Sequence, residues 1–229
     1  MKKKVLAFTM AVLMLGTLAL TGCQKEEAPI AADKVAVALF EMILKNDASS
    51  AVELFGYASE EDARKDMGLD GDLYDEMAEE MVSQFSSMGF TASTEDVQTF
   101  IDAFMSMFKD VTMTAVVKSS DEKSGKAVVT CTISTFDPNA LNDAMTEAMT
   151  EAISDPDVVN SGEKDAAFSL MLNAISSAIA DLTPTGETTD FDVDFELSTL
   201  SINGKDRKAW VPVDANAFGN AISTNSMGG

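Results

Sequence analysis

Two pairs of segments in this sequence alternate between apolar and polar residues, which is the two-residue period of a β-strand. The first pair covers 111–117 and 127–136 and is joined by the turn-rich sequence DEKSG. The second pair covers 191–202 and 209–213 and is joined by the turn signal Asn203-Gly204. Each pair predicts an antiparallel hairpin, so we expect one sheet of about four strands.

Most of the remaining chain has apolar residues three or four positions apart, which is the helical period. The predicted helices cover 33–45, a short segment ending at 55, a short segment opened by the capping pattern at 59–62, 72–88, a segment from the capping box at 93–96 through 108, about 138–153, 163–182, and a last short one that Asp214 caps and that ends at 222. The fold class that follows is α+β: helices packed on one curved antiparallel sheet, with two hairpins separated by a helical segment. A β-bulge is expected near Ser198-Thr199, where the apolar positions change phase.

The first residues have the three regions of a secretory signal peptide: three lysines, an uncharged apolar stretch from Val5 to Gly22, and small residues at its end. The apolar part, 5–20, is shorter than the roughly 20 residues of a membrane-spanning helix. It is followed by acidic residues instead of a basic flank, so a retained anchor helix is the less favoured interpretation.

The end of this stretch, Leu20-Thr21-Gly22-Cys23, resembles the bacterial lipobox. The resemblance implies that the Cys23 thiol receives a diacylglycerol, that the Gly22–Cys23 bond is cut, and that Cys23 becomes the mature N-terminus. Two acyl chains hold a protein stably on a bilayer, whereas one gives only reversible binding. The alternative is an ordinary secretory signal with a chance cysteine.

These signals divide the chain into four predicted parts. They are a lipoprotein signal peptide (1–22), the lipidated cysteine with its tether (23–32), a single α+β domain (33–222) and a disordered tail (223–229). The expected location is the extracytoplasmic face of the cell membrane, with the membrane itself as a partner through the lipid on Cys23.

Charge limits the partners of the mature chain. Removing residues 1–22 leaves 207 residues and takes away three lysines, so the formal charge moves from −22 to −25. Nucleic acid is therefore excluded as an expected partner, because phosphate backbones are bound by clustered Lys and Arg. The same acidity disfavours docking flat on an anionic leaflet, so the domain is expected to stand off the membrane on its tether.

Histidine is absent from the whole sequence, and a single cysteine remains after Cys23. The lack of histidine removes the commonest general base and nearly all zinc sites, so we expect neither an enzyme nor a cofactor. Cys131 lies on the apolar face of a predicted strand and is interpreted as a buried structural thiol in preference to a reactive one.

The densest acidic stretch runs from Asp66 to Glu80. An EF-hand loop starting at Asp66 would place Gly71 at its sixth position, but its third position is Gly68 and its twelfth is Met77, where a bidentate Glu is needed. We therefore predict no metal site and interpret the stretch as an acidic helix N-terminus.

A second acidic group, formed by Asp190, Asp192, Asp194 and Glu196, shares one face of a predicted strand, with neighbours about 7 Å apart. Such a row could hold cations or a basic peptide. The favoured interpretation is the solvated side of a sheet whose other side is apolar.

Twelve methionines remain after the signal peptide, including the helical pairs Met77/Met81 and Met145/Met149. Thioethers suit copper(I), but without histidine the favoured role is adaptable core packing. Met and Phe stripes could also line an apolar groove or pocket for a lipid-like ligand or a peptide.

The opening ADKVAVALFEMILKNDASSAVELF resembles the start of cystatin-like and nuclear-transport-factor-2-like domains, and the late segment KAWVPVD, with Trp210, resembles the same group. The whole mature chain also resembles uncharacterised lipoproteins of Gram-positive bacteria. The resemblance implies a sheet that curls around a helix and encloses a ligand cavity in some members. It implies no particular activity, because function varies freely on such a scaffold.

Three functions remain open from the sequence. The first is a lipid-anchored, surface-exposed binding or interaction domain without catalysis and of unknown specificity, for which a protein is one candidate partner. The second is a pocket for a small or hydrophobic ligand between sheet and helices, and the third is a carboxylate-dependent enzyme. A transporter's solute-binding subunit is disfavoured, because two lobes of repeated βα units are not found in the pattern.

Overall fold

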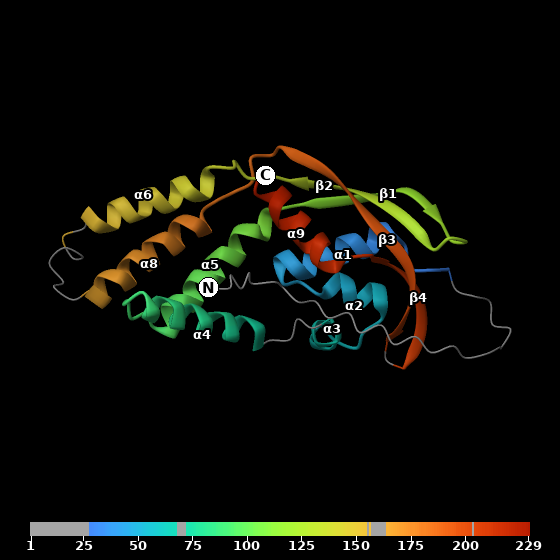
Figure 1. Cartoon of the computed structure of the whole chain (residues 1–229), viewed down its shortest axis with the longest axis horizontal. Coiled ribbons are helices and arrows are strands. Elements are labelled where there is room, and N and C mark those ends of the chain that lie inside the picture. The colour runs from blue at the N-terminus through green and yellow to red at the C-terminus, as the bar shows by residue number, and fades with distance from the viewer. Residues whose placement is uncertain (1–27, 68–71, 155, 157–163, 203) are drawn as a thin grey trace. The chain divides into compact units, whose positions relative to one another are not determined.

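A computed structural model describes residues 28–67, 72–154, 156, 164–202 and 204–229, with the backbone alone for 72–74 (Figure 1). These residues form two compact units. Unit 1 takes the described residues of Met1–Asp70, Thr112–Ser134 and Thr188–Ser226, and unit 2 takes those of Gly71–Val111, Thr135–Glu187 and Met227–Gly229. The number of domains stays a prediction, and each unit is described by itself.

Unit 1 is built on an antiparallel sheet with the strand order β1-β2-β3-β4. The strands are β1 (Met113–Asp121), β2 (Lys126–Ser134), β3 (Thr188–Ile202) and β4 (Lys205–Pro212). Each strand pairs with its neighbour in sequence, and the helical segment 135–187 separates the two hairpins. The predicted class, α+β with helices on a curved four-stranded antiparallel sheet, is confirmed.

One face of the sheet is covered by two helices. Helix α1 (Ala32–Lys45) contacts β1, β2 and β4, and α9 (Ala215–Ser226) contacts β2 and β3. The alternation in β2 turns its apolar side chains toward these helices, so Val129, Cys131 and Ile133 are fully buried. Phe195 of β3 meets Phe218 of α9 edge to face, at 6.3 Å between ring centroids. We call the other side of the sheet the open face.

Two short helices follow α1 in unit 1. Helix α2 (Ser49–Phe55) packs on α1, and α3 (Glu60–Asp66) packs on α2. Asn46 ends α1 in the left-handed conformation, with φ 53°. The side chain of Ser59 accepts a hydrogen bond from the Asp62 backbone N–H, as the capping pattern predicts.

The predicted β-bulge near Ser198-Thr199 is wrong. The register of β3 with β4 runs unbroken from Phe195↔Pro212 to Ile202↔Lys205. The irregularity lies instead in β1, between Val117 and Ser119, at Lys118. The apolar positions of β3 do change phase, but no extra residue is inserted there. Strand β2 stops pairing with β3 at Glu196, so the β3 side chains beyond that point have different neighbours and a different pattern of burial.

The last helix is longer than predicted. It continues four residues past Ile222 to Ser226, so the expectation of a disordered tail is wrong for 223–226. The end of the helix is held by burial: Ser226 is fully buried, and its hydroxyl donates to the Ser223 carbonyl at 2.9 Å. Asp214 begins this helix as predicted, accepting from the Ala217 N–H at 2.9 Å.

Unit 2 is helical in its described residues. Its elements are α4 (Asp72–Ser87), α5 (Thr94–Met107), the short 3-10 helix η1 (Phe108–Asp110), α6 (Ala140–Ser154) and α8 (Lys164–Ala180). Helix α5 packs on both α4 and α8, and α6 packs on α8. At the N-terminus of α5, Ser93 accepts from the Asp96 N–H at 3.0 Å, as the sequence predicts.

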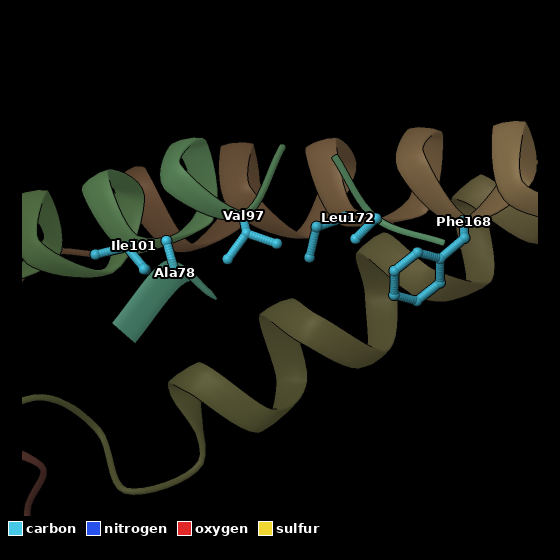
Figure 2. Close-up of a cluster of buried hydrophobic side chains, with 6 residues drawn as sticks. Ala78, Val97, Ile101, Phe168 and Leu172 are labelled. Atoms are coloured by element: carbon cyan, nitrogen blue, oxygen red, sulfur yellow. The ribbon is translucent and has the colours of Figure 1, made fainter. Parts of the chain in front are cut away.

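The core of unit 2 lies between α4, α5 and α8. Figure 2 shows Ala78 of α4, Val97 and Ile101 of α5, and Phe168 and Leu172 of α8 in this cluster. Two further rings pack against Phe168: Phe90 is stacked at 4.6 Å and Phe85 is edge-on at 5.1 Å, between centroids.

Candidate functional site

The predicted anchor, Cys23, lies outside the described residues, but the end of its tether is described. Ile30 forms a parallel bridge with Ala209 at the edge of β4. Its N–H donates to the Lys208 carbonyl at 2.9 Å, and its carbonyl accepts from the Trp210 N–H at 3.1 Å. The chain therefore enters unit 1 by adding to the sheet edge, which sequence periodicity did not indicate because only one residue pairs.

The acidic row of β3 lies on the open face. Asp190, Asp192 and Asp194 are exposed, and Glu196 is half-buried. The intervening Phe195 is only 1% exposed. The row is thus brought together as predicted, and its exposure agrees with the solvated-side interpretation.

Two threonines of β2 hold the first two carboxylates of this row. The Thr132 hydroxyl donates to an Asp190 Oδ1 at 2.7 Å, and the Thr130 hydroxyl donates to Asp192 Oδ1 at 2.6 Å. Both contacts follow from the register, in which Thr132 lies opposite Asp190 and Thr130 opposite Asp192.

Asp192 also forms an ion pair with Lys118, the residue at the β1 irregularity. The hydrogen bonds from Lys118 and Thr130 lower the pKa of Asp192 below its ordinary value, because they favour the ionised carboxylate. Sequence reasoning missed Lys118, since a bulge that turns its side chain toward β3 leaves no periodic signal.

The other acidic stretch is only partly described, because 68–71 and the side chains of 72–74 lie outside the described residues. Asp66 accepts a hydrogen bond from the Tyr57 hydroxyl at 2.7 Å, and Asp75 accepts from the Gln98 side-chain amide at 2.9 Å. Burial and the Asp66 hydrogen bond raise the pKa of Tyr57. Among the described residues, no group of three or more potential ligands is placed to hold a metal ion.

The methionine pairs separate in the structure. Met77 and Met81 pack against the unit 2 core cluster, in the role predicted for them. Met145 is half-buried on α6, and Met149 is 38% exposed. Two other large apolar side chains are exposed in unit 2: Ile153 of α6 and Leu170 of α8.

Cys131 is buried between β2 and its covering helices, as predicted. Burial, with a smaller effect of the Asp192 charge, raises the pKa of its thiol to about 12. A raised pKa favours the protonated thiol at neutral pH, so we expect Cys131 to be unreactive in the folded protein.

No helix in the described part of the chain is both long and apolar enough to span a bilayer.

Comparison with known proteins finds the fold but no family. No family model matches the sequence, and no curated protein matches it. A similar solved structure is that of "a putative lipoprotein (ycdA)" from Bacillus subtilis subsp. subtilis str. 168, with 16% sequence identity and a TM-score of 0.53. The match covers 83% of this chain and 55% of that protein, so the chain corresponds to about half of the neighbour's length. At this identity the likeness shows the fold alone.

Proposed function

We propose that the mature protein is a bacterial lipoprotein held on the extracytoplasmic face of the membrane through a lipid on Cys23. The observation that carries the proposal is the sequence Leu20-Thr21-Gly22-Cys23 behind a basic and apolar leader. A second support is the fold shared with a Bacillus subtilis protein described as a putative lipoprotein. The similarity to cystatin-like and nuclear-transport-factor-2-like domains stays a prediction.

We further propose that the described domain acts by binding or interaction and not by catalysis. Its acidic row supports this, because three of its four carboxylates are exposed on the open sheet face and two of them, Asp190 and Asp192, accept hydrogen bonds from β2. A catalytic pair would be expected in a site that excludes water and shifts a carboxyl pKa upward. The pKa of Asp192 is shifted downward instead.

The anchoring proposal is tested with the full chain expressed in a Gram-positive host. We expect the purified protein to begin at Cys23, to carry the added mass of a diacylglycerol on that residue, and to remain in the membrane fraction. The variant Cys23→Ser should lose both the lipid mass and membrane retention. Cys131→Ala is the matched control, since it removes the other cysteine and should leave processing unchanged. A parent chain without added lipid mass on Cys23, or a Cys23→Ser chain that is processed and retained in the membrane fraction as the parent is, would contradict the proposal.

The interaction proposal is tested by native mass spectrometry of the detergent-extracted protein. The expected mass is that of the lipidated chain, alone or with a second polypeptide. A small molecule retained at one copy per chain would contradict a role confined to protein interaction and would favour a ligand pocket.

A further inference from the structure

The β3–β4 hairpin extends beyond the rest of the sheet. Strand β2 pairs with β3 only as far as Glu196, whereas β3 and β4 stay paired to Ile202↔Lys205. Residues 198–202 and 205–209 therefore form a two-stranded extension, which we call the overhanging hairpin (Figure 1). Five residue pairs at about 3.3 Å each give it a length of about 17 Å.

The charge of the overhanging hairpin is opposite to that of the chain. It carries Lys205, Arg207 and Lys208 against one carboxylate, Asp206, in a protein whose formal charge is −22. Lys205 and Lys208 are exposed. Arg207 is half-buried and donates to the Phe55 carbonyl at 3.0 Å, which fixes the hairpin against the end of α2.

The described end of the tether, residues 28–30, enters unit 1 along this hairpin. Because Ile30 and Ala209 form a parallel bridge, the chain preceding Ile30 comes from the Lys205 end of β4. Seven residues from Cys23 to Ile30 span at most about 25 Å, and the four residues from Ala209 back to Lys205 span about 13 Å. A tether of this length can therefore reach the hairpin end and about 12 Å beyond it, so a lipid on Cys23 and the hairpin lysines can meet the same leaflet.

We propose that the overhanging hairpin docks on anionic phospholipid headgroups of the bilayer in which the lipid of Cys23 is inserted. The proposal rests on the proposed lipidation of Cys23. The tether adds Lys25 against Glu26 and Glu27, so hairpin and tether together keep a net positive charge. The surrounding acidic protein is repelled by the same leaflet, and attraction at one end with repulsion elsewhere orients unit 1 on the membrane.

The experiment uses the lipidated full chain in phosphatidylcholine vesicles, with and without phosphatidylglycerol, and measures energy transfer from a labelled cysteine to an acceptor in the headgroups. Ser201→Cys reports the overhanging hairpin. Thr114→Cys is the matched control, because it is also an exposed strand residue and lies opposite Thr132, which pairs with Asp190. Ser201 is therefore about 35 Å along β3 from the level of Thr114. The buried Cys131 is not labelled.

We expect stronger transfer from Ser201→Cys than from Thr114→Cys in vesicles that contain phosphatidylglycerol. Adding Lys205→Gln and Lys208→Gln should lower the ratio of docked to undocked molecules about 25-fold, since each lysine near an anionic surface contributes about fivefold. The pair Lys123→Gln and Lys126→Gln removes two exposed lysines at the β1–β2 turn and should leave the transfer unchanged.

Flotation with the vesicles tests the lipid anchor separately from the docking of the hairpin. A chain that does not float contradicts the lipid anchor. The docking proposal is overturned if the chain floats but energy transfer is equal at the two labels. It is also overturned if transfer from Ser201→Cys does not depend on phosphatidylglycerol or on the hairpin lysines. Unchanged transfer on vesicles, together with lysine-dependent binding of an acidic protein, would assign the hairpin to that partner and also overturn it.

Discussion

At the scale of single residues, the open face of the sheet is organised by contacts that cross strands. Asp192 of β3 accepts hydrogen bonds from Lys118 of β1 and Thr130 of β2, so one carboxylate links three strands. Both partners lower the pKa of Asp192. A lowered pKa in the folded state gives a stabilisation that is present above the unfolded value of about 3.9 and is lost as the pH falls through the folded value.

We predict that Lys118→Met raises the pKa of Asp192 toward its ordinary value, because the largest cause of its lowering is removed. The measurement is the pH titration of the Asp192 carboxyl carbon by NMR. Lys123→Met, which removes an exposed lysine from the β1–β2 turn, should leave the pKa of Asp192 unchanged. The ion pair has no effect on the carboxylate if both variants titrate like the parent protein.

Cys131 gives a second prediction at this scale. Because the thiol is buried and its pKa is raised to about 12, it should not react with a thiol reagent at pH 8 in the folded protein and should react fully after unfolding in urea. Cys131→Ser should lower the free energy of unfolding by about 1–3 kcal/mol, since a hydroxyl replaces an apolar group in the core. Rapid labelling of the folded chain would show that the thiol is accessible.

At the scale of elements, helix α5 of unit 2 begins where the Ser93 side chain accepts a hydrogen bond from a backbone N–H group of the first turn. Ser93→Ala removes the acceptor of the Asp96 N–H and should lower the free energy of unfolding by about 1 kcal/mol. Hydrogen exchange of the α5 amides measures this change. Thr94→Ala is the neighbouring control, because Thr94 is exposed and follows the cap. Equal effects of the two substitutions would contradict a capping role.

A substitution in the buried face of α8 should lower the free energy of unfolding by more than the loss of a helix cap does. Phe168→Ala removes a buried ring that contacts Phe85 and Phe90 and should cost about 3–5 kcal/mol through lost burial and a cavity. Leu170→Ala on the same helix should cost less than about 0.5 kcal/mol, because Leu170 is 44% exposed. Amide exchange in α5 and α8 gives both values. A similar cost at the two positions would place Phe168 outside the core of unit 2.

At the scale of the whole molecule, net charge is the dominant electrostatic property. The chain has 38 acidic and 16 basic residues, so like charges repel one another in the compact state. We predict that added potassium chloride raises the urea midpoint while the slope of the transition stays the same, since salt screens this repulsion. Fluorescence of Trp210, the single tryptophan, reports unit 1, and circular dichroism reports the helices. A midpoint independent of salt would show that repulsion does not limit stability.

Much of the secondary structure was predictable from local signals. Ser59, Ser93 and Asp214 occupy the caps that their sequence context predicts, because a cap depends on residues only three positions away. The strand faces were also predictable, since alternation decides which side chains enter the core. The end of α9 was not, because Ser226 is held by burial in the folded unit.

The sequence by itself was enough to predict most of the helices, the strand faces, the buried thiol and the acidic row, and it carries the signal from which Cys23 is proposed as the anchor. Only the tertiary structure decided that β2 and β3 are neighbours, that Lys118 reaches Asp192, and that Ile30 pairs with β4. The reason is physical. Periodicity and capping depend on neighbours within one or two turns. Strand order, bulge position and edge pairing depend instead on contacts between residues far apart in the chain, and packing and backbone hydrogen bonding decide among the alternative pairings.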